Sequence, residues 1–578
     1  MKIDQIKLKG YRNFKDATVN FSEKTLIIGA NDVGKSNLLH AMRLLLDRSI
    51  SDWDTEPVDS DFYCHEETSE LSITIKFSEV NEESVIARLP GKISDQKELF
   101  ISYQANKKNK TYKFLLGPKE NLLEEIQERY YRKAVHLKYI SSNRDLYDYI
   151  RREKRNLLKE AQEKRSESEI KSDNKSFTEI EKNLIDANDK ISKLSYVSKS
   201  TEAINAELEK LSFHHTGQEV IFDVGTSDLD SFIGNLQLAS RANNSNLLIG
   251  GDGRNNQIFL ALWAARNEIK EENPLEVVFY CIEEPEAHLH PHQQRKLAEY
   301  LINTLKGQVF ITTHSPQIAS EFSANSIVRL LVDQKSTIAA SDGCSKIISD
   351  SITNFGHRLN IIASEAFFAN AVLLVEGQSE ILFYKVLARE LGIDLDRLNI
   401  SILMADGIGF KVFVEILQAL GIEWVLRTDN DVFKIPKKNE YRLAGVQRAV
   451  EIYKNCCSSD SNFDIFLAAN EKYLTGFANE AVPSSIKSKA DEITSKLSNF
   501  DIFVSDKDLE NDLLNEEIGP RIVTFLKVQD REEALSIMEK RKATFMYHFL
   551  KEHSKELKKL NKSNLALPLL ACKRLIEG

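Results

Sequence analysis

Four carboxylates follow two apolar, strand-like runs in the second half of the chain. Glu376 comes directly after the first run, which ends at Val375, and Glu380 follows four residues later. Asp429 and Asp431 come directly after the second run. The spacing predicts that Glu380 lies on the first turn of a helix, facing the same sheet edge as Glu376, and that Asp429 and Asp431 share one face of a strand. Glu376, Asp429 and Asp431 are therefore expected to converge at the carboxyl ends of parallel strands.

Carboxylates crowded at a sheet edge predict a bound cation. They repel one another unless a positive charge lies between them, and oxygen ligands favour Mg²⁺ or Mn²⁺ over zinc. The alternative is a solvated cluster of surface acids. The apolar strands before both pairs of acids favour the metal site.

A glycine-rich loop near the start of the chain has the spacing of a phosphate-binding loop. Residues Gly29 to Ser36 match G-x-x-x-x-G-K-[ST] between a strand-like and a helix-like run. The glycines, Gly34 among them, let loop N–H groups such as that of Asn31 close around phosphates. Lys35 is expected to neutralise the β- and γ-phosphates, and the Ser36 hydroxyl to bind Mg²⁺.

Three further side chains fit a nucleotide site. The apolar run Val277 to Ile282 is followed by Glu283 and Glu284. Glu283 stands where a carboxylate would hold the Mg²⁺ shell, and Glu284 where one would polarise the attacking water. His314 ends a later strand-like run and is expected to sense the γ-phosphate. A lone histidine there would more often be structural, but this one follows the two other motifs in the expected order.

This set of motifs resembles the ABC-type heads of the structural-maintenance and recombination-repair ATPases over about residues 1 to 340. The run Gly10 to Phe14 is typical of them. The resemblance implies that the glycine-rich loop Gly250 to Arg254, with Gly251, is a signature loop that clasps the nucleotide of a partner subunit; a plain helix-entry loop is the alternative. Three departures bear on the hydrolysis rate more than on nucleotide binding. Glu283 replaces the usual Asp, Gly250 replaces the usual Ser, and no clear Q-loop is present, although residues 141 to 143 lie near its place.

The pattern Glu-Gly-x-x-Glu followed by Asp-x-Asp resembles the Toprim domain of topoisomerases, primases and some nucleases, and Asp406 to Gly409 fits that family's glycine turn. With an ABC-type head before it, the order resembles the overcoming-lysogenization-defect (OLD) nuclease family over nearly the whole chain. That resemblance implies a two-metal site, held by Glu376, Glu380, Asp429 and Asp431 and completed by a Leu-Glu-x-Asp-Leu motif and a downstream lysine. The residues that match are Glu510, Asp512 and Lys542; Lys540 remains an alternative to Lys542, which precedes the apolar run Phe545 to Leu550.

The expected fold class is α/β, with an ABC-type head followed by a Toprim domain built on a Rossmann-like parallel sheet. We expect the head in residues 1–150 and 212–345, and the Toprim domain with a helical C-terminal part in residues 346–578. The stretch 151–211 is rich in Glu, Lys, Ser, Asn and Asp. It is expected to be a helical arm used for self-association; the alternative is a solvated linker.

The amino-acid composition does not exclude DNA binding. The chain has 578 residues and a formal net charge of −10, which argues against an all-over basic surface but not against a local basic track. No apolar run is long enough for a membrane span, and the N-terminus lacks the apolar core of a signal peptide. The six cysteines form no CxxC pair, so neither a zinc site nor a disulfide framework is expected. A reducing cytoplasm is the simplest location.

The residues and the resemblance together predict a nucleotide-regulated, divalent-metal-dependent endonuclease that nicks or cleaves double-stranded DNA. Length, domain order and the helical insertion resemble most the nuclease subunit of Gabija anti-phage systems, which implies a UvrD-like helicase as a partner. One P-loop and one signature loop per chain predict a homo-oligomer, a dimer of dimers. The alternatives are a solitary OLD-type nuclease in DNA repair and a non-cleaving, ATP-driven DNA clamp. A topoisomerase or primase is disfavoured, because neither a strand-passage tyrosine domain nor a zinc-binding primer module is visible.

Overall fold

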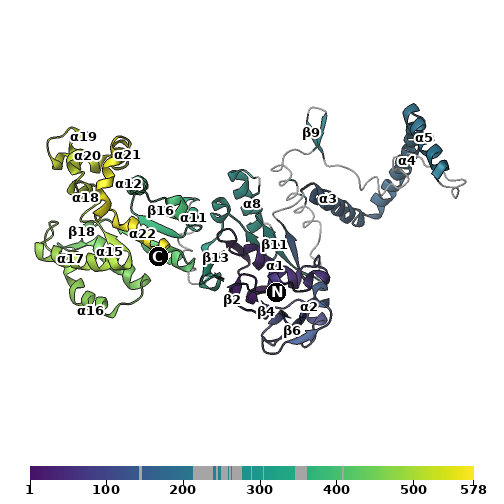
Figure 1. Cartoon of the computed structure of the whole chain (residues 1–578), viewed down its shortest axis with the longest axis horizontal. Helices are drawn as coiled ribbons and strands as arrows, with labels where there is room; N and C mark the ends of the chain where they lie inside the picture. Colours follow the sequence, from purple (N-terminus) through teal and green to yellow (C-terminus); the bar gives the residue numbers. More distant parts are fainter. Residues whose placement is uncertain are drawn as a thin grey trace. The chain divides into compact units, whose positions relative to one another are not determined.

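The computed structural model describes most of the chain, which forms two compact units (Figure 1). The first unit comprises residues 1–142, 274–286 and 291–578, and the second comprises residues 143–273 and 287–290. The described residues are 1–141, 146–211, 239–242, 245–248, 258, 262, 276–287, 289–303, 305–344, 361–405 and 409–578.

The chain begins with a six-stranded antiparallel sheet in the order β2-β1-β4-β5-β6-β7. Alternating residues of its long strands are buried, so one face of the sheet contributes to a core. The strands are β1 (Lys2–Tyr11), β2 (Phe14–Asn20), β4 (Glu70–Ser78), β5 (Leu99–Asn106), β6 (Thr111–Gly117) and β7 (Glu124–Ile126).

A second six-stranded sheet has the order β14-β13-β3-β12-β11-β8, and all of its strands are parallel except β14. Strand β12 lies between β3, which leads into the phosphate-binding loop, and β11, which ends in Glu283. The motifs that follow these strands therefore meet at one edge. The strands are β3 (Lys24–Ile28), β8 (Val135–Ile140), β11 (Val277–Glu283), β12 (Val309–Thr312), β13 (Ile327–Asp333) and β14 (Ser336–Ala339).

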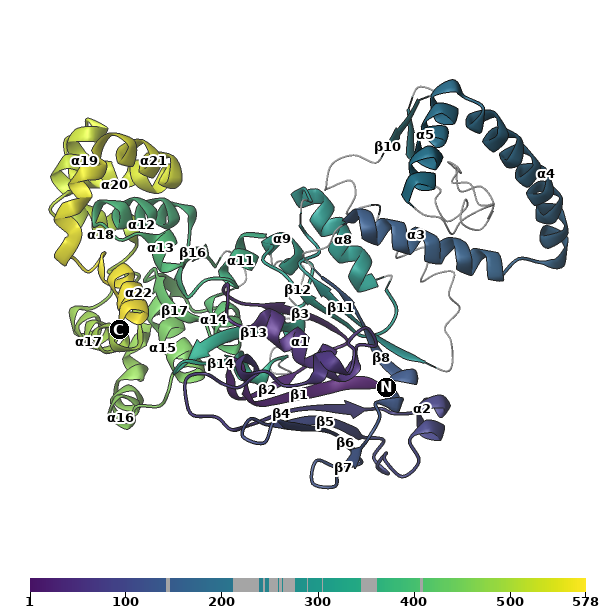
Figure 2. The same cartoon turned by 45° about the vertical axis from the view of Figure 1, so that its right-hand side comes forward.

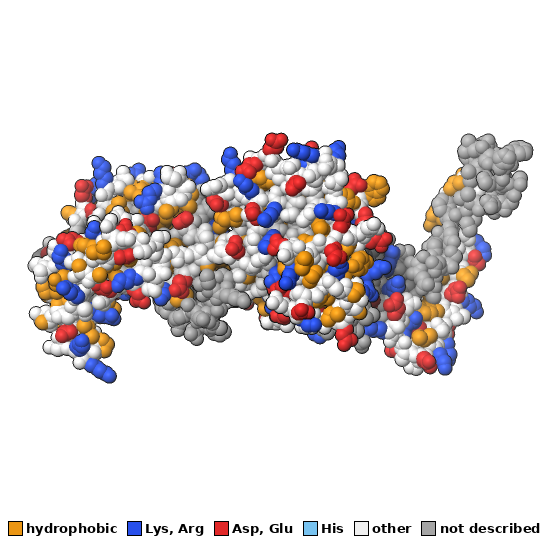
Figure 3. Space-filling view, turned by 90° about the horizontal axis from the view of Figure 1, so that it is seen from below, with side chains coloured by type: hydrophobic (Ala, Val, Ile, Leu, Met, Phe, Trp, Pro, Cys, Tyr) orange, Lys and Arg blue, Asp and Glu red, His pale blue; other side chains and the backbone are white. Residues whose placement is uncertain are grey.

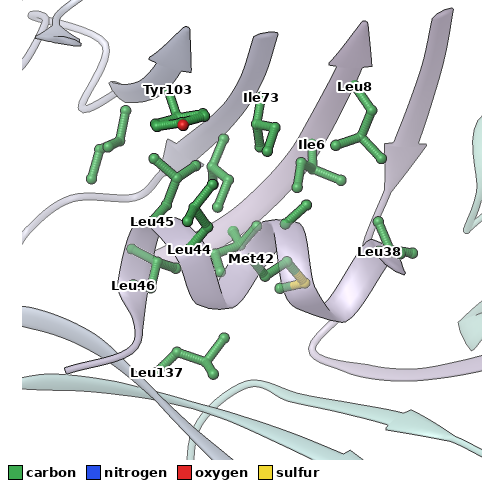
Figure 4. Close-up of a cluster of buried hydrophobic side chains, with 14 of the residues drawn as sticks. Ile6, Leu8, Leu38, Met42, Leu44, Leu45, Leu46, Ile73, Tyr103 and Leu137 are labelled. Atoms are coloured by element: carbon green, nitrogen blue, oxygen red, sulfur yellow. The ribbon is translucent and has the colours of Figure 1, made fainter. Parts of the chain in front are cut away.

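Helix α1 (Lys35–Leu46) joins the two sheets into one hydrophobic core (Figure 2). Leu38, Met42 and Leu45 of the helix belong to the same buried cluster as Ile73 of the antiparallel sheet and Leu137 of β8 (Figure 4). Apolar residues on several sides of α1 fix the helix that carries Lys35 and Ser36. Helices α8 (Pro291–Asn303) and α9 (Pro316–Ala319) follow β11 and β12.

The C-terminal part is built on a four-stranded parallel sheet in the order β16-β15-β17-β21. The strands are β15 (Ala371–Val375), β16 (Ile400–Met404), β17 (Glu423–Thr428) and β21 (Ile502–Val504). A small antiparallel sheet follows β17, with β18 (Val432–Lys434), β19 (Tyr441–Leu443) and β20 (Thr475–Phe477). The parallel pairing of these strands confirms the predicted Rossmann-like parallel sheet.

Helices surround this sheet and share its core. Buried residues of α12, α18, α21 and α22 pack in one cluster with residues of β15 and β16. The helices of this part are α11 (Ile361–Ala366), α12 (Gln378–Glu390), α13 (Leu395–Leu398), α14 (Phe410–Ala419), α15 (Ala444–Cys456), α16 (Ser461–Asn470), α17 (Ser484–Leu497), α18 (Leu509–Asn515), α19 (Gly519–Leu526), α20 (Arg531–Lys540), α21 (Lys542–His553) and α22 (Leu567–Glu577).

The second unit is mainly helical among its described residues. It contains α3 (Leu146–Glu163), α4 (Glu167–Ser192) and α5 (Ser195–Leu211), and a hairpin of β9 (Ala239–Ala242) and β10 (Ser245–Leu248). A capping box between Ser166 and Glu169 begins α4, and this helix buries none of its residues. The apolar side chains of Ile185 and Tyr196 are exposed. The expected helices in 151–211 are thus present, while their use in self-association stays a prediction.

In the part of the chain that the structure describes, no helix is long and apolar enough to cross a membrane. On the face drawn in Figure 3, Lys and Arg side chains are intermingled with Asp and Glu side chains.

Candidate nucleotide and nuclease sites

The phosphate-binding loop is shaped by two glycines and held by Asn13. Gly29 and Gly34 have positive φ angles of 152° and 108°. A Cβ atom on Gly34 would lie 2.0 Å from Nδ2 of Asn13, and that amide donates to the carbonyl of Val33 at 2.7 Å and to Oγ1 of Thr337 at 2.6 Å. The sequence placed Asn13 only in a run typical of ABC-type heads. The structure shows that Asn13, which follows the end of β1, binds the loop at Val33.

Lys35 and Ser36 begin α1 directly behind this loop. The buried ammonium of Lys35 donates to the carbonyls of Gly29 at 3.0 Å and Ala30 at 2.8 Å. Burial lowers the pKa of Lys35, although the carboxylate of Glu284 raises it. The hydroxyl of Ser36 donates to Oε1 of Glu283. Ser36 and Glu283, which were predicted to share a Mg²⁺ shell, are therefore in contact although they lie 247 residues apart in the sequence.

Glu284 and His314 face each other at the same edge. Glu284 has a positive φ of 43°, and its N–H donates to the carbonyl of Thr312 at 3.0 Å. Nε2 of His314 lies 3.5 Å from Oε1 of Glu284. Burial and the nearby Lys35 lower the pKa of His314, so its imidazole is neutral at pH 7. A neutral ring offers one donor and one acceptor nitrogen to bound groups.

Glu286 is a site residue that the sequence did not single out. Its Oε1 accepts hydrogen bonds from Oγ1 of Thr313 at 2.7 Å and from the N–H of His314 at 2.8 Å. Its Oε2 is buried without a hydrogen-bond partner in the described part of the chain. Burial raises the pKa of this carboxyl group. Glu286 fixes the backbone that carries His314; its position two residues after Glu284 was the available signal.

Some predicted positions lie outside the described residues. These are the signature-like loop with Gly251, residues 142 and 143 of the Q-loop candidate, and residues 406 to 408 of the Toprim glycine turn.

The second site is centred on Glu376, at the carboxyl end of β15. Its Oε1 accepts hydrogen bonds from the hydroxyl of Thr428 and from the N–H of Asp429 at 3.0 Å. The guanidinium of Arg448 contacts the same carboxylate, and its Nη2 lies 3.2 Å from Oδ2 of Asp431. Arg448 therefore bridges two of the acids that the sequence assigns to one metal.

The buried Arg427 forms ion pairs with two other predicted acids, Glu380 and Asp512. Its Nη1 donates to Oε1 of Glu380 at 2.6 Å, and its Nη2 donates to Oδ2 of Asp512 at 2.8 Å. The second oxygen of Glu380 accepts from the N–H groups of Glu376 and Gly377, each at 2.8 Å. Both oxygens of Glu380 are thus engaged, and this side chain ties α12 to the end of β15. Arg427 is almost fully buried, and the sequence did not predict its role.

Asp429, Glu510 and Lys542 form the third part of the site. Burial, and then the charge of Glu380, raise the pKa of Asp429 to about 8. Oε1 of Glu510 is buried with no hydrogen-bond partner in the described structure, and burial raises the pKa of this side chain too. Nζ of Lys542 lies 3.9 Å from Oε2 of Glu510. Lys540, the alternative lysine, is exposed and has no ion pair with these acids among the described residues.

Among the described residues, Lys542 is the lysine that forms an ion pair with one of these acids. Burial lowers its pKa, but the carboxylates of Glu510 and Asp429 raise it above the ordinary value. Lys542 therefore remains charged at neutral pH and neutralises only part of the local negative charge.

The prediction that Asp429 and Asp431 share one face of a strand is wrong. Strand β17 ends at Thr428, so Asp429 and Asp431 lie beyond it and do not share a strand face. Asp429 is near Glu380 and Lys542, whereas Asp431 pairs with Arg448. The two acids still lie at the same sheet edge, because the loop between them is short.

The donor set fits a divalent cation. No group of three or more His, Cys, Asp and Glu side chains is gathered in a metal-holding arrangement in the described ranges. Arg427 and Arg448 engage four of the acids. The buried Oε1 of Glu510, which has no hydrogen-bond partner in the described structure, and the raised pKa of Asp429 indicate oxygen donors that suit a cation.

Family models match both parts of the chain that carry these sites. Residues 1–319 match the family model described as "AAA ATPase domain", which is more than half of the chain. The chain belongs to this AAA ATPase domain family. Residues 367–431, which include Glu376, Asp429 and Asp431, match the "Overcoming lysogenization defect protein-like, TOPRIM domain". The predicted fold class and the predicted OLD-family resemblance are thereby confirmed.

Several relatives of this ATPase are named nucleases. It is 28% identical to "Endonuclease GajA" of Bacillus cereus (strain VD045) over 89% of each chain. It is 28% identical to "OLD nuclease" of Thermus scotoductus over 34% of this chain and 38% of that one. It is 31% identical to "Old nuclease" of Escherichia phage P2 over 31% and 33% of the two chains. The combination of an ATPase and a Toprim domain is that of a DNA nuclease, which confirms the predicted enzyme class.

Proposed function

We propose that this protein is a divalent-metal-dependent endonuclease that nicks or cleaves double-stranded DNA under the control of ATP. The observation that carries the proposal is the group of acids at the carboxyl edge of the Toprim sheet, with the charged Lys542 beside them. This group holds Glu376, Glu380, Asp429, Asp431, Glu510, Asp512 and Lys542.

Glu376, Asp429, Asp431 and Glu510 are the proposed metal ligands, and Glu380 and Asp512 complete the acidic set. Their oxygen donors suit Mg²⁺ or Mn²⁺. These carboxylates would hold a pair of such ions, which would supply Lewis acidity for activating a water molecule and stabilising the leaving 3′-oxygen. Glu380 and Asp512 share Arg427, which supports a positioning role for them in the arrangement described here.

Lys542 is proposed to neutralise charge on the scissile phosphate. Its ammonium is half-exposed while Glu510 beside it is buried, so the lysine faces solvent where a phosphate can approach. A preorganised cation at developing negative charge favours the transition state over the ground state.

The ATPase part is proposed to bind ATP with Mg²⁺ and to regulate cutting. Asn31, Gly34, Lys35 and Ser36 would hold the phosphates and the ion, with Glu283, Glu284 and His314 at the γ-phosphate. Gly251 is proposed to contact the nucleotide of another subunit, which makes the working form a homo-oligomer, a dimer of dimers. The ATPase part is assigned to residues 1–150 and 212–345, the helical arm to 151–211 and the Toprim part to 346–578.

The proposed biological role is anti-phage defence in the bacterial cytoplasm, together with a UvrD-like helicase. It is supported by the similarity to "Endonuclease GajA" over 89% of both chains. Co-purification of the chain with the product of a neighbouring helicase gene tests this role.

A plasmid-cutting assay tests the proposed activity. The wild-type protein is expected to convert supercoiled DNA to nicked or linear forms with Mg²⁺ or Mn²⁺ and to stop when EDTA is added. Glu376→Gln should lose at least ~100-fold in rate. Glu423→Gln is the matched control, because Glu423 is exposed at the opposite end of the neighbouring strand β17. Full cutting by Glu376→Gln, or cutting that EDTA does not affect, would overturn the proposal.

A non-cleaving DNA clamp is the second candidate. It is favoured by one observation, the engagement of four of the acids by Arg427 and Arg448. A wild-type protein that binds DNA with ATP but never cuts it with either metal would select this function.

A further inference from the structure

Arg448 is the residue that the proposed function leaves unexplained. It lies on α15 and contacts both Glu376 and Asp431. Its Nη1 also donates to Oγ1 of Thr428 at 2.6 Å. One guanidinium thus occupies the position between two carboxylates where a shared cation would bind.

The backbone fixes Arg448 over this position. The N–H of Ala444 donates to the carbonyl of Asp431 at 2.8 Å, and a Cβ atom on Gly445 would lie 2.1 Å from the carbonyl oxygen of Asp429. The start of α15 is therefore packed directly against the acidic loop. Residues three and four positions apart share a helix face, so Arg448 projects from the face that carries Ala444 and Gly445.

The two arginines of the site differ in access to solvent. The Arg427 side chain is 3% exposed, and its partners Glu380 and Asp512 are 5% and 15% exposed. The Arg448 side chain is 32% exposed, and Glu376 and Asp431 are 25% and 37% exposed. Arg427 is enclosed and structural, whereas Arg448 can leave its partners and be hydrated without opening the core.

We infer that Arg448 is a positioning residue that competes with the divalent cation for Glu376 and Asp431. The guanidinium holds the two carboxylates in place and shields them from other cations. When a divalent cation binds, it replaces the guanidinium as their positive partner. This inference rests on the proposed function, because it assumes that the two acids are metal ligands. It predicts that the protein binds metal less tightly than its carboxylates alone would allow.

Mn²⁺ binding to the full-length protein, followed by electron paramagnetic resonance without nucleotide or DNA, tests this inference. Arg448→Gln should bind Mn²⁺ about three- to tenfold more tightly than the wild type, since a competing ion pair is removed. Arg448→Lys should fall between them, because an ammonium cannot bridge both carboxylates as a guanidinium does. Arg442→Gln is the matched control; Arg442 is exposed nearby and bonds to Gln447 at 3.3 Å.

Thermal unfolding gives a second readout. In EDTA, Arg448→Gln should unfold at a lower temperature than the wild type, because Glu376 and Asp431 then repel each other without a cation. Mn²⁺ should raise its unfolding temperature by more than it raises that of the wild type or of Arg442→Gln.

The outcomes separate the inference from the proposed function. Mn²⁺ affinity of Arg448→Gln equal to or weaker than that of the wild type overturns the inference. If Glu376→Gln loses Mn²⁺ binding in that same experiment, the metal site itself still stands. If Glu376→Gln binds Mn²⁺ as the wild type does, both the metal site and the competition are wrong.

Discussion

The guanidinium of Arg329 donates a hydrogen bond of 2.9 Å to the carbonyl oxygen of Gly421, and this contact joins the ATPase sheet to the Toprim part. The same side chain donates to the carbonyls of Leu420 at 3.1 Å and Ala369 at 2.8 Å. Burial lowers the pKa of Arg329 to about 10. Strand β13, which carries Arg329, pairs with β3, which leads into the phosphate-binding loop.

A cavity of about 390 Å³ lies beside this contact. It is lined by loop residues 29 to 33 and by Phe368, Asn370 and Gly421 of the Toprim part. The outer side of the phosphate-binding loop therefore borders the Toprim part at the amino ends of β15 and β17.

Arg329→Gln is expected to weaken both the fold and the response to ATP. Loss of a charged donor to three backbone carbonyls should lower the free energy of unfolding by about 2–4 kcal/mol. Denaturant titration measures this loss, and plasmid cutting with and without ATP measures the response. Arg397→Gln is the control, since the Arg397 side chain forms an exposed ion pair with Glu577 and its loss should change stability by less than about 1 kcal/mol. An unchanged response to ATP would show that the coupling does not pass through Arg329.

Lys542→Gln should reduce DNA cutting by at least ~100-fold, because the cation beside the scissile phosphate is lost. Lys540→Gln should cut at nearly the wild-type rate, since Lys540 is exposed and has no ion pair with the site acids in the described structure. Single-turnover plasmid nicking compares the two variants. The reverse result would assign the role to Lys540.

The sequence predicted which elements carry the acids, but not how the acids are neutralised. The apolar runs that precede Glu376, Glu283 and Asp429 sufficed to place the strands, because burial on both faces of a parallel sheet leaves a continuous apolar signal. The partners Arg427 and Arg448 carry no such signal. In the sequence, neither arginine can be distinguished from other arginines of strands and helices. Only tertiary packing brings the two side chains to the acids.

Two other positions show the same limit. Asn13 was visible as part of a typical run, yet its contacts with Val33 and Thr337 depend on strands that are distant in sequence. The expected common face for Asp429 and Asp431 assumed that the strand continued, whereas β17 ends at Thr428. Strand ends are set by pairing with neighbours, and β17 pairs with β21 only as far as Thr428.

Lys35→Ala should abolish ATP binding while metal-dependent cutting persists. Lys35 lies at the phosphate-binding loop, and the proposed nuclease acids belong to another sheet. Binding of a fluorescent ATP analogue and plasmid cutting over a range of ATP concentrations measure the two properties. Cutting by Lys35→Ala that responds to ATP as the wild type does would refute control through this loop.

Acid should destabilise the ATPase core through His40. The ring of His40 lies on α1, 2.8 Å from the hydroxyl of Tyr11. Burial, with Arg12 and Arg43 nearby, lowers its pKa to about 4. The unfolded chain therefore binds a proton on this side chain below about pH 6.5, whereas the folded chain does not. Stability is complete above pH 6.5 and is lost as the pH falls toward 4, by about 1–3 kcal/mol. Urea titrations of the wild type and His40→Gln at pH 7.5 and 5 should show a smaller loss for the variant; equal losses would exclude His40 as the cause.

The helical arm should hold subunits together through its exposed apolar side chains. Ile185 of α4 and Tyr196 of α5 are 55% and 68% exposed, and α4 buries none of its residues. A long helix with so little packing of its own is stable only when another surface covers it. A second copy of the arm supplies such a surface under the two-fold symmetry that most homo-oligomers adopt. Ile185→Glu combined with Tyr196→Glu should therefore lower the mass measured by light scattering, while Lys182→Glu, a charge change on the same helix, should not. A double variant with the wild-type mass would show that the arm does not hold the assembly, and a monomeric wild type with and without ATP would remove the oligomer itself.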